Sequence, residues 1–207
     1  MRSNHACRGR HSVVRYADDA VLLFAREQDA HRVMAVLPKR FGKYGLTLHP
    51  EKTRLIEFRR PDLRAQLVRA GASHQPGTFD LLGFTHYWNH SRSGKWIVRR
   101  STAKDRFRRA LRRVTDWCRE HRHDDLQAQQ QVLVQKLRGH YAYFGITGNA
   151  EALGRFLYEV TRAWRKWLDR RSQRARVDWA RMIDLQKRYP LPRPSIKPIR
   201  TPGAANP

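Results

Sequence analysis

In the first hundred residues, short apolar runs typical of strands alternate with a stretch of apolar residues at helical spacing. Two apolar runs, 12–16 and 20–25, flank Ala17-Asp18-Asp19, so we predict a tight hairpin with two carboxylates at the bend. Between residues 26 and 45, apolar positions at helical spacing predict a helix that Pro38 should kink or end early and that Gly42 and Gly45 should close: Ala30, Val33, Met34, Leu37 and Phe41. Further strand candidates are residues 46–48, 55–58, 79–84 and 96–98.

From residue 101 the hydrophobic period becomes that of helices. Thr102 with Asp105 resembles a capping box, and a first apolar stripe follows it at Phe107, Ala110, Leu111, Val114 and Cys118. Residues 132–144 are expected to form another helix, ended by Gly145. The most regular stripe comes next, at Leu153, Phe156, Leu157, Val160, Trp164, Trp167 and Leu168. A last helix is predicted around residues 179–185, before Pro190, so the second half should be a helical module.

The net charge of the chain indicates the class of its partner. Forty-three Lys and Arg against 18 Asp and Glu give 207 residues a net charge of +25. A polyanion is the expected partner, and nucleic acid is the commonest one. Tryptophans are interleaved with arginines in both halves, so the basic residues should belong to folded surfaces. Only the Pro-rich end, residues 197–207, is predicted to be an unstructured tail.

Neither a membrane segment nor a structural zinc site is expected. No stretch approaches 18 continuous apolar residues, and the basic N-terminus has no apolar run behind it, which predicts a cytoplasmic protein. Cys7 and Cys118 lie far apart and outside any paired C-x-x-C spacing, so disulfides are not expected. His121 and His123 follow Cys118 closely, but the apolar stripe already explains Cys118, and a metal site there is disfavoured.

Two adjacent carboxylates at a bend repel each other unless a cation lies close. In proteins that bind phosphates this cation is usually Mg²⁺, held by a few carboxylates and by substrate phosphates. Two such ions about 3.5–4 Å apart can activate a hydroxyl and stabilise a leaving pyrophosphate, which is polymerase chemistry. Asp-Asp is also ordinary turn composition. The preceding aromatic residue and the flanking apolar strands favour the metal-binding interpretation for Asp18 and Asp19.

Four sequence blocks follow one another along the chain. They are Y-A-D-D-A-V-L-L-F at residues 16–24, Y-G-L-T-L-H-P-E-K-T-R-L at 44–55, F-D-L-L-G-F at 79–84 and L-R-G-H-Y-A-Y-F-G at 137–145, the last followed by R-A-W-R-K-W at 162–167. In this order they resemble the C-terminal part of reverse transcriptase/maturases encoded by group II introns: the Y-x-D-D hairpin, the next palm block, the turn that grips the primer, and the maturase-specific helices. The resemblance extends from about residue 13 to about residue 199.

The resemblance implies roles for particular residues. Asp18 and Asp19 match the catalytic carboxylates that bind Mg²⁺, Asp18 being the better ligand, and Lys52 matches a lysine near the incoming triphosphate. The primer grip matches Leu82, Gly83 and Phe84. Enzymes of this family also supply a metal-binding aspartate from an upstream strand, and residues 1–15 contain no Asp or Glu. Because two carboxylates alone should hold Mg²⁺ weakly, we expect no polymerisation by this chain alone. A separate N-terminal reverse-transcriptase portion is an expected partner.

Arginines on the outer faces of the predicted helices are candidate RNA contacts. Arginine suits phosphates and aromatic side chains suit packing or base stacking. A high density of cations without matching acids favours phosphate contact over a merely solvated face at Arg106, Arg109, Arg113, Arg138, Arg165, Lys166, Arg170, Arg171 and Arg174. Trp164 and Trp167 lie on an apolar stripe, so we expect them in the core. Tyr141 and Tyr143 point in different directions on one helix, so at most one should be core.

The predicted fold is therefore α+β: a partial reverse-transcriptase palm over residues 1–100, a thumb-like helix over 101–124 and a maturase-specific helical domain over 125–196. The function implied by the resemblance is that of a group II intron reverse transcriptase/maturase fragment that binds intron RNA and an RNA/DNA template-primer and aids splicing and mobility. Two alternatives stay open: a noncatalytic RNA-binding splicing factor, and an inactive remnant of a mobile element.

Overall fold

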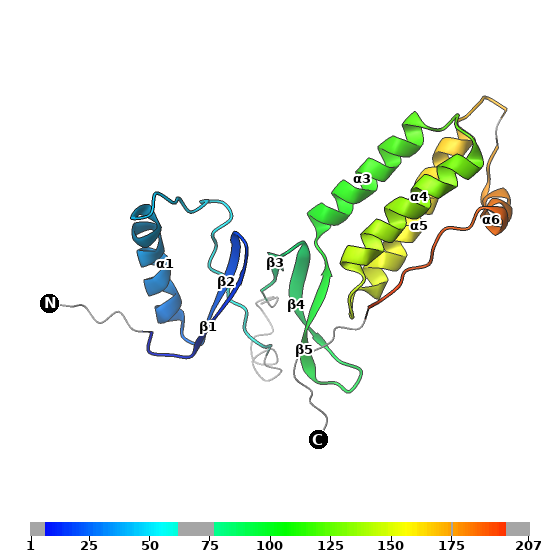
Figure 1. Ribbon diagram of the computed structural model, residues 1–207. Helices are drawn as coiled ribbons and strands as arrows, with labels where there is room; N and C mark the ends of the chain where they lie inside the picture. The colour runs from blue at the N-terminus through cyan, green and yellow to red at the C-terminus, as the bar shows by residue number, and fades with distance from the viewer. Residues whose placement is uncertain (1–6, 62–76, 175, 198–207) are drawn as a thin grey trace, which may run out of the picture. The chain divides into compact units, whose positions relative to one another are not determined.

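The computed structural model describes residues 7–61, 77–174 and 176–197. It confirms a mixed α and β chain, and Figure 1 shows the elements in order: β1 (His11–Tyr16), β2 (Asp19–Phe24), α1 (Glu27–Gly42), β3 (Phe79–Leu81), β4 (Phe84–His90), β5 (Trp96–Thr102), α3 (Lys104–Glu120), α4 (Leu126–Phe144), α5 (Ala150–Asp169) and α6 (Trp179–Arg188). The chain divides into two compact units. Described residues up to 82 and residues 86–98 form the first, and residues 83–85 with the described residues from 99 onward form the second.

In the first unit, β1 and β2 form the predicted antiparallel hairpin. The register pairs His11 with Phe24 at the open end and Tyr16 with Asp19 next to the turn. Every residue of β1 is exposed, whereas α1 packs against β2 and partly covers Val21, Leu22 and Phe24. An isolated two-stranded ribbon has little stability of its own, so α1 is the main support of this hairpin within the described residues.

Helix α1 differs from the prediction in that it runs through Pro38 to Gly42 without ending. Pro38 is exposed, so its ring faces solvent, and its missing N–H removes one hydrogen bond from a helix of 16 residues. Gly45 follows in a left-handed conformation, with φ at 68°, which sends the chain back toward the helix.

The predictions of strands at residues 46–48 and 55–58 are wrong. Neither segment is assigned to a strand, because neither takes part in a β-ladder with another part of the described chain. Residues 46–48 instead line an open hollow of about 400 Å³ against α1, together with Met34, Pro38, Gly42, Pro50 and Thr53.

Strands β3, β4 and β5 form a three-stranded sheet in that order. The strand predicted over residues 79–84 is in fact two strands, because Leu82 and Gly83 make a turn between β3 and β4. Both have positive φ, 52° and 77°, as the tight turns that suit twisted hairpins require. The strand predicted at residues 96–98 is confirmed and continues to Thr102.

In the second unit, α3, α4 and α5 lie side by side and α6 lies across one end of the bundle (Figure 1). The core consists of Val114, Cys118, Leu133, Leu137, Tyr141, Leu153, Phe156, Val160, Trp164, Leu168, Val177 and Met182. The predicted apolar stripes of α3 and α5 are thereby confirmed. Burial raises the pKa of the Cys118 thiol to about 12, which fits an inert packing role. Tyr141 is buried and Tyr143 is 57% exposed, so one of the two tyrosines is core.

The starts of α3 and α4 differ from their predictions. Thr102 is the last residue of β5 and forms no capping box; the N-cap of α3 is Ala103, and Asp105 pairs with Arg109 instead. Helix α4 begins at Leu126, well before residue 132, because the Asp125 carboxylate caps it by accepting from Gln127 N at 2.8 Å. The residues that follow Asp125 are mostly polar, so apolar periodicity does not indicate the first turn of α4.

Residues 190–197 run back along the helical unit. The Gln130 amide donates to Pro190 O at 2.8 Å, the Tyr141 hydroxyl donates to Pro192 O at 3.2 Å, and Lys197 N donates to Gly145 O at 2.7 Å. Lys197, the first residue of the predicted tail, is therefore attached to the bundle. The remainder of that tail, residues 198–207, lies outside the described residues.

Candidate nucleic-acid interface and acidic hairpin

The β1–β2 turn carries the acidic pair. Tyr16 and Asp19 are the last paired residues, so Ala17 and Asp18 form a two-residue turn in which Ala17 has φ at 50°. Asp18 and Asp19 are both exposed, and within the described part of the chain neither forms an ion pair. The adjacent Arg15 donates through Nε to Ala17 O at 3.1 Å, so this guanidinium is bound to the backbone of the turn. Both carboxylates therefore remain accessible to a cation.

The donor set at this turn fits Mg²⁺ in kind but is small. Carboxylate oxygens are the ligands that Mg²⁺ prefers, and Asp18 and Asp19 would hold the ion. Among residues 7–61, 77–174 and 176–197, no group of three or more His, Cys, Asp or Glu side chains comes together as a metal site. A bound Mg²⁺ would supply positive charge for substrate phosphates, which would in turn complete its coordination.

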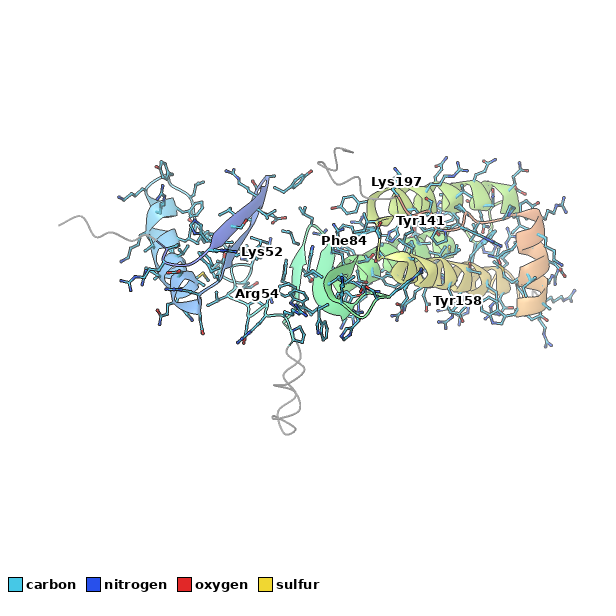
Figure 2. All side chains as sticks on the ribbon, turned by 90° about the horizontal axis from the view of Figure 1, so that it is seen from below. Lys52, Arg54, Phe84, Tyr141, Tyr158 and Lys197 are labelled. Atoms are coloured by element: carbon cyan, nitrogen blue, oxygen red, sulfur yellow. The ribbon has the colours of Figure 1, made fainter. Side chains whose placement is uncertain are left out.

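Lys52 lies on a turn after α1. Its backbone N–H donates to His49 O at 3.2 Å, and that of Thr53 donates to the same carbonyl at 3.0 Å. The side chain is exposed and forms no ion pair within the described residues; Figure 2 labels it together with Arg54. No hydrogen bond found there joins Lys52 to Asp18 or Asp19. A joint role of the three residues stays a prediction.

Gly83 and Phe84, in the turn at residues 82–84, belong to the second unit and contact its helices. Ala103 N, at the start of α3, donates to Gly83 O at 2.9 Å. The Phe84 ring (Figure 2) packs on the end of α4, with centroid distances of 5.3 Å to Phe144 and 6.0 Å to Tyr143. A Cβ at Gly83 would lie 3.6 Å from the Arg106 side chain and the Phe144 ring, which is an ordinary van der Waals distance, so glycine is favoured here by its positive φ.

The predicted RNA-binding arginines of α3 and α4 differ in their partners. Arg109 pairs with Asp105 at 2.7 Å and Arg106 approaches the same carboxylate at 3.7 Å, so two guanidinium groups share one carboxylate. Arg113 and Arg138 are exposed and form no ion pair with any described residue. Exposed ion pairs contribute little to stability. All four guanidinium groups therefore remain accessible to a polyanion.

The predicted RNA-binding residues around the end of α5 are more involved in the structure itself. Arg171 donates to Arg122 O and Asp124 O, so it holds the loop between α3 and α4. Arg165 donates to Val177 O at 2.9 Å. Lys166 and Arg170 lie over the Trp167 ring at 5.3 and 5.5 Å from its centroid. Arg174 is exposed with no ion-pair partner in the part of the chain described.

One surface cluster is not predicted from the sequence. Tyr158 on α5 and Trp179 at the start of α6 stack with their rings 6° from parallel, and Arg162 and Arg165 lie over those rings. The signal that could have found it is the spacing of Tyr158, Arg162 and Arg165, which places them on one helix face outside the apolar stripe. The contact with Trp179 is tertiary, and no periodicity reports it.

The fold and the surface define a class: an α+β segment with an exposed acidic turn, joined to a helical bundle whose surface is rich in arginine and suited to a polyanion. Residues 2–86 match the family model described as reverse transcriptase (RNA-dependent DNA polymerase). This segment includes the hairpin, α1, Lys52 and the turn at residues 82–84, whereas α3 to α6 lie outside it. Searches of curated proteins and of solved structures give no match. None of the helices described here is both long and apolar enough to cross a membrane.

Proposed function

We propose that this chain is part of a group II intron reverse transcriptase/maturase and that its helical unit binds structured intron RNA. The observation that carries the proposal is the exposed arginine surface of α3 to α5, on a bundle that follows a segment matching the reverse-transcriptase family. The chain has a net charge of +25, and the helices that carry these arginines share a packed core. The arginines therefore lie on a surface whose backbone is fixed. Such a surface binds phosphates of a folded RNA by shape and charge.

Within the palm-like segment, Asp18 and Asp19 are proposed to hold Mg²⁺, and Lys52 to contact the triphosphate. The turn at residues 82–84 is proposed to grip a primer end, supported by its attachment to α3 and α4 through Gly83 and Phe84. Two carboxylates bind Mg²⁺ weakly without phosphate oxygens or further acidic ligands. We propose that polymerisation depends on a partner that supplies further metal ligands, whereas RNA binding does not.

A competition titration tests the RNA-binding proposal. The full chain is titrated with a labelled group II intron RNA on filters, with unlabelled intron RNA or an unrelated structured RNA of equal length as competitor. Intron RNA is expected to compete better, because shape recognition adds to the common electrostatic term. Equal competition by the two RNAs would contradict intron recognition. Absence of binding at low salt would contradict the function as a whole.

Primer extension with Mg²⁺ tests the inactivity of the chain alone. No extension of an RNA-templated primer is expected, and Asp18→Ala should not change that result. Extension by the wild-type chain that Asp18→Ala abolishes would contradict it and would show that this chain polymerises through Asp18.

A further inference from the structure

Two large aromatic side chains lie stacked on the surface of the helical unit. Tyr158 of α5 and Trp179, the first residue of α6, have nearly parallel rings whose centroids are 6.2 Å apart. Tyr158 is 55% exposed and Trp179 is 41% exposed, and Figure 2 shows Tyr158 projecting from the surface of α5. The distance lies in the range of offset-stacked pairs. Ring surface therefore stays accessible to solvent on a preformed aromatic pair.

Two arginines accompany this pair at fixed positions. The Arg165 guanidinium lies 4.8 Å from the Trp179 ring centroid and is held by its hydrogen bond to Val177 O at 2.9 Å. The Arg162 guanidinium lies 5.8 Å from the Tyr158 ring centroid and is held by Glu159 at 3.1 Å. Cation–π contact and these hydrogen bonds together restrict both side chains. The cluster thus combines π surface with oriented positive charge.

The charge around the cluster favours one kind of ligand. Arg176 and Arg181 are exposed at the start of α6, where Arg181 donates to Arg176 O at 3.2 Å. The nearby acids Glu159 and Asp178 already accept hydrogen bonds, from Arg162 and from Arg181 N respectively. A ligand that matches this surface carries flat π faces and regularly spaced negative charges. Single-stranded RNA has both, whereas the bases of a continuous duplex are stacked inside it.

We propose that Tyr158 and Trp179 form a stacking site for an unpaired base of bound RNA, with Arg162 and Arg165 beside the flanking phosphates. This inference rests on the proposed RNA-binding function and deepens it, because it makes a loop, bulge or single-stranded end the substrate of this surface. Aromatic stacking tolerates any base, so the site selects for an unpaired nucleotide and not for a sequence.

The test compares RNA forms and variants with the full chain. The probes are an A-rich single-stranded oligoribonucleotide, the same strand with an abasic stretch, and an RNA duplex of equal length. Tyr158→Ala is expected to raise the Kd for the single strand roughly tenfold, which corresponds to the loss of one stacked base. The same variant should change the Kd for the duplex and for the abasic strand less than about twofold. Trp179→Ala should act in the same way.

Three controls make the result specific. Tyr158→Phe keeps the ring and should bind the single strand like wild type. Ile183→Ala removes an exposed apolar side chain from α6 and should leave all three affinities unchanged. Thermal unfolding reports whether Trp179→Ala folds; if it does not, Tyr158→Ala against Tyr158→Phe decides.

The outcomes separate this inference from the function beneath it. Equal loss of single-strand and duplex binding in Tyr158→Ala, or no change in either, would overturn the stacking site while RNA binding stands. A protein ligand for this surface would give the latter result. Failure of the wild-type chain to bind any of the three RNAs at low salt would instead contradict the proposed function.

Discussion

Asn149 joins the end of β5 to the end of α4 through its buried side-chain amide. Its Oδ1 accepts from Thr102 N at 2.9 Å, and its Nδ2 donates to Thr102 Oγ1 at 2.9 Å and to Phe144 O at 2.8 Å. The residue is 1% exposed, so water cannot replace these partners. A single side chain thereby satisfies the N–H of Thr102 and adds a second donor to Phe144 O, between the end of β5 and the end of α4.

Asn149→Ala should lower the free energy of unfolding by about 2 kcal/mol. It leaves the buried N–H of Thr102 without its partner, which costs about 1–3 kcal/mol, whereas Phe144 O keeps the hydrogen bond that it accepts from Ile146 N at 2.8 Å. Chemical denaturation followed by tryptophan fluorescence measures the change. Gln131→Ala, on the exposed side of α4, is the control and should change stability by less than about 0.5 kcal/mol. Equal stability of the two variants would contradict this role of Asn149.

His140 is packed among aromatic rings within the helical unit. Its ring lies 3.8 Å from that of Phe156 and 4.6 Å from that of Phe144, measured between centroids, and its Nε2 has no hydrogen-bond partner among the described residues. Burial disfavours the charged imidazolium and lowers the pKa of His140 to about 4. The folded bundle therefore holds this residue neutral.

The pKa of His140 predicts a pH dependence of stability. Between the unfolded pKa of about 6.5 and the folded value of about 4, the unfolded chain binds the additional proton. Stability should therefore fall as pH drops through this window, by at most about 3 kcal/mol. Denaturation of wild type and His140→Phe across pH measures it, and the difference between their curves isolates His140. Parallel curves from pH 7 to pH 4 would contradict the prediction.

At the scale of elements, the sequence predicts best where one face of an element is buried. The stripe from Leu153 to Leu168 predicts most of α5, whereas the apolar runs on either side of Asp18 and Asp19 predict the hairpin although β1 is exposed. It predicts worst where a tertiary contact determines the local structure. Residues 46–48 have the composition of a strand, but they fold as a loop against α1. Thr102 forms a hydrogen bond with Asn149, which is distant in sequence, and so forms no capping box.

Two arginines that look alike in sequence should behave differently when substituted. Arg113→Gln, on the exposed face of α3, should weaken RNA binding while changing stability by less than about 0.5 kcal/mol. Arg171→Gln should lower the free energy of unfolding by about 1–2 kcal/mol, because it removes two hydrogen bonds to carbonyls of the α3–α4 loop and leaves them with the Gln129 amide alone. Denaturation and filter binding on both variants measure the two effects. A stability loss in Arg113→Gln equal to that in Arg171→Gln would contradict the assignment.

The hairpin and the helices should differ in local stability. Strand β1 is exposed along its whole length, whereas α3, α4 and α5 share one core. Local opening follows the number of buried contacts, so backbone amides of residues 11–24 should exchange with deuterium much faster than those of α5. Hydrogen exchange followed by mass spectrometry resolves the two regions. Equal protection of β1 and α5 would show that something further covers the hairpin.

For the whole molecule, the sequence predicts a nucleic-acid partner and most residues of the candidate site, and these stay predictions. The acidic turn and the basic surface could be predicted because adjacency and charge are properties of sequence. The stacked pair of Tyr158 and Trp179 could not, because it joins two helices through a turn whose path depends on packing around Met182 and Val177. The same holds for Arg165 and Arg171, whose hydrogen bonds to distant carbonyls appear only in the folded chain.

The salt dependence of RNA binding tests most directly whether the arginine surface holds a polynucleotide. The affinity of the full chain for intron RNA is measured over a range of salt concentrations, for wild type and for the double variant Arg113→Gln/Arg138→Gln. We expect log K to fall linearly with log salt, with a slope on the order of −4 or steeper for wild type. The double variant should have a slope shallower by about 1–2, for two lost phosphate contacts. A wild-type affinity independent of salt, or an identical slope in the double variant, would contradict the claim.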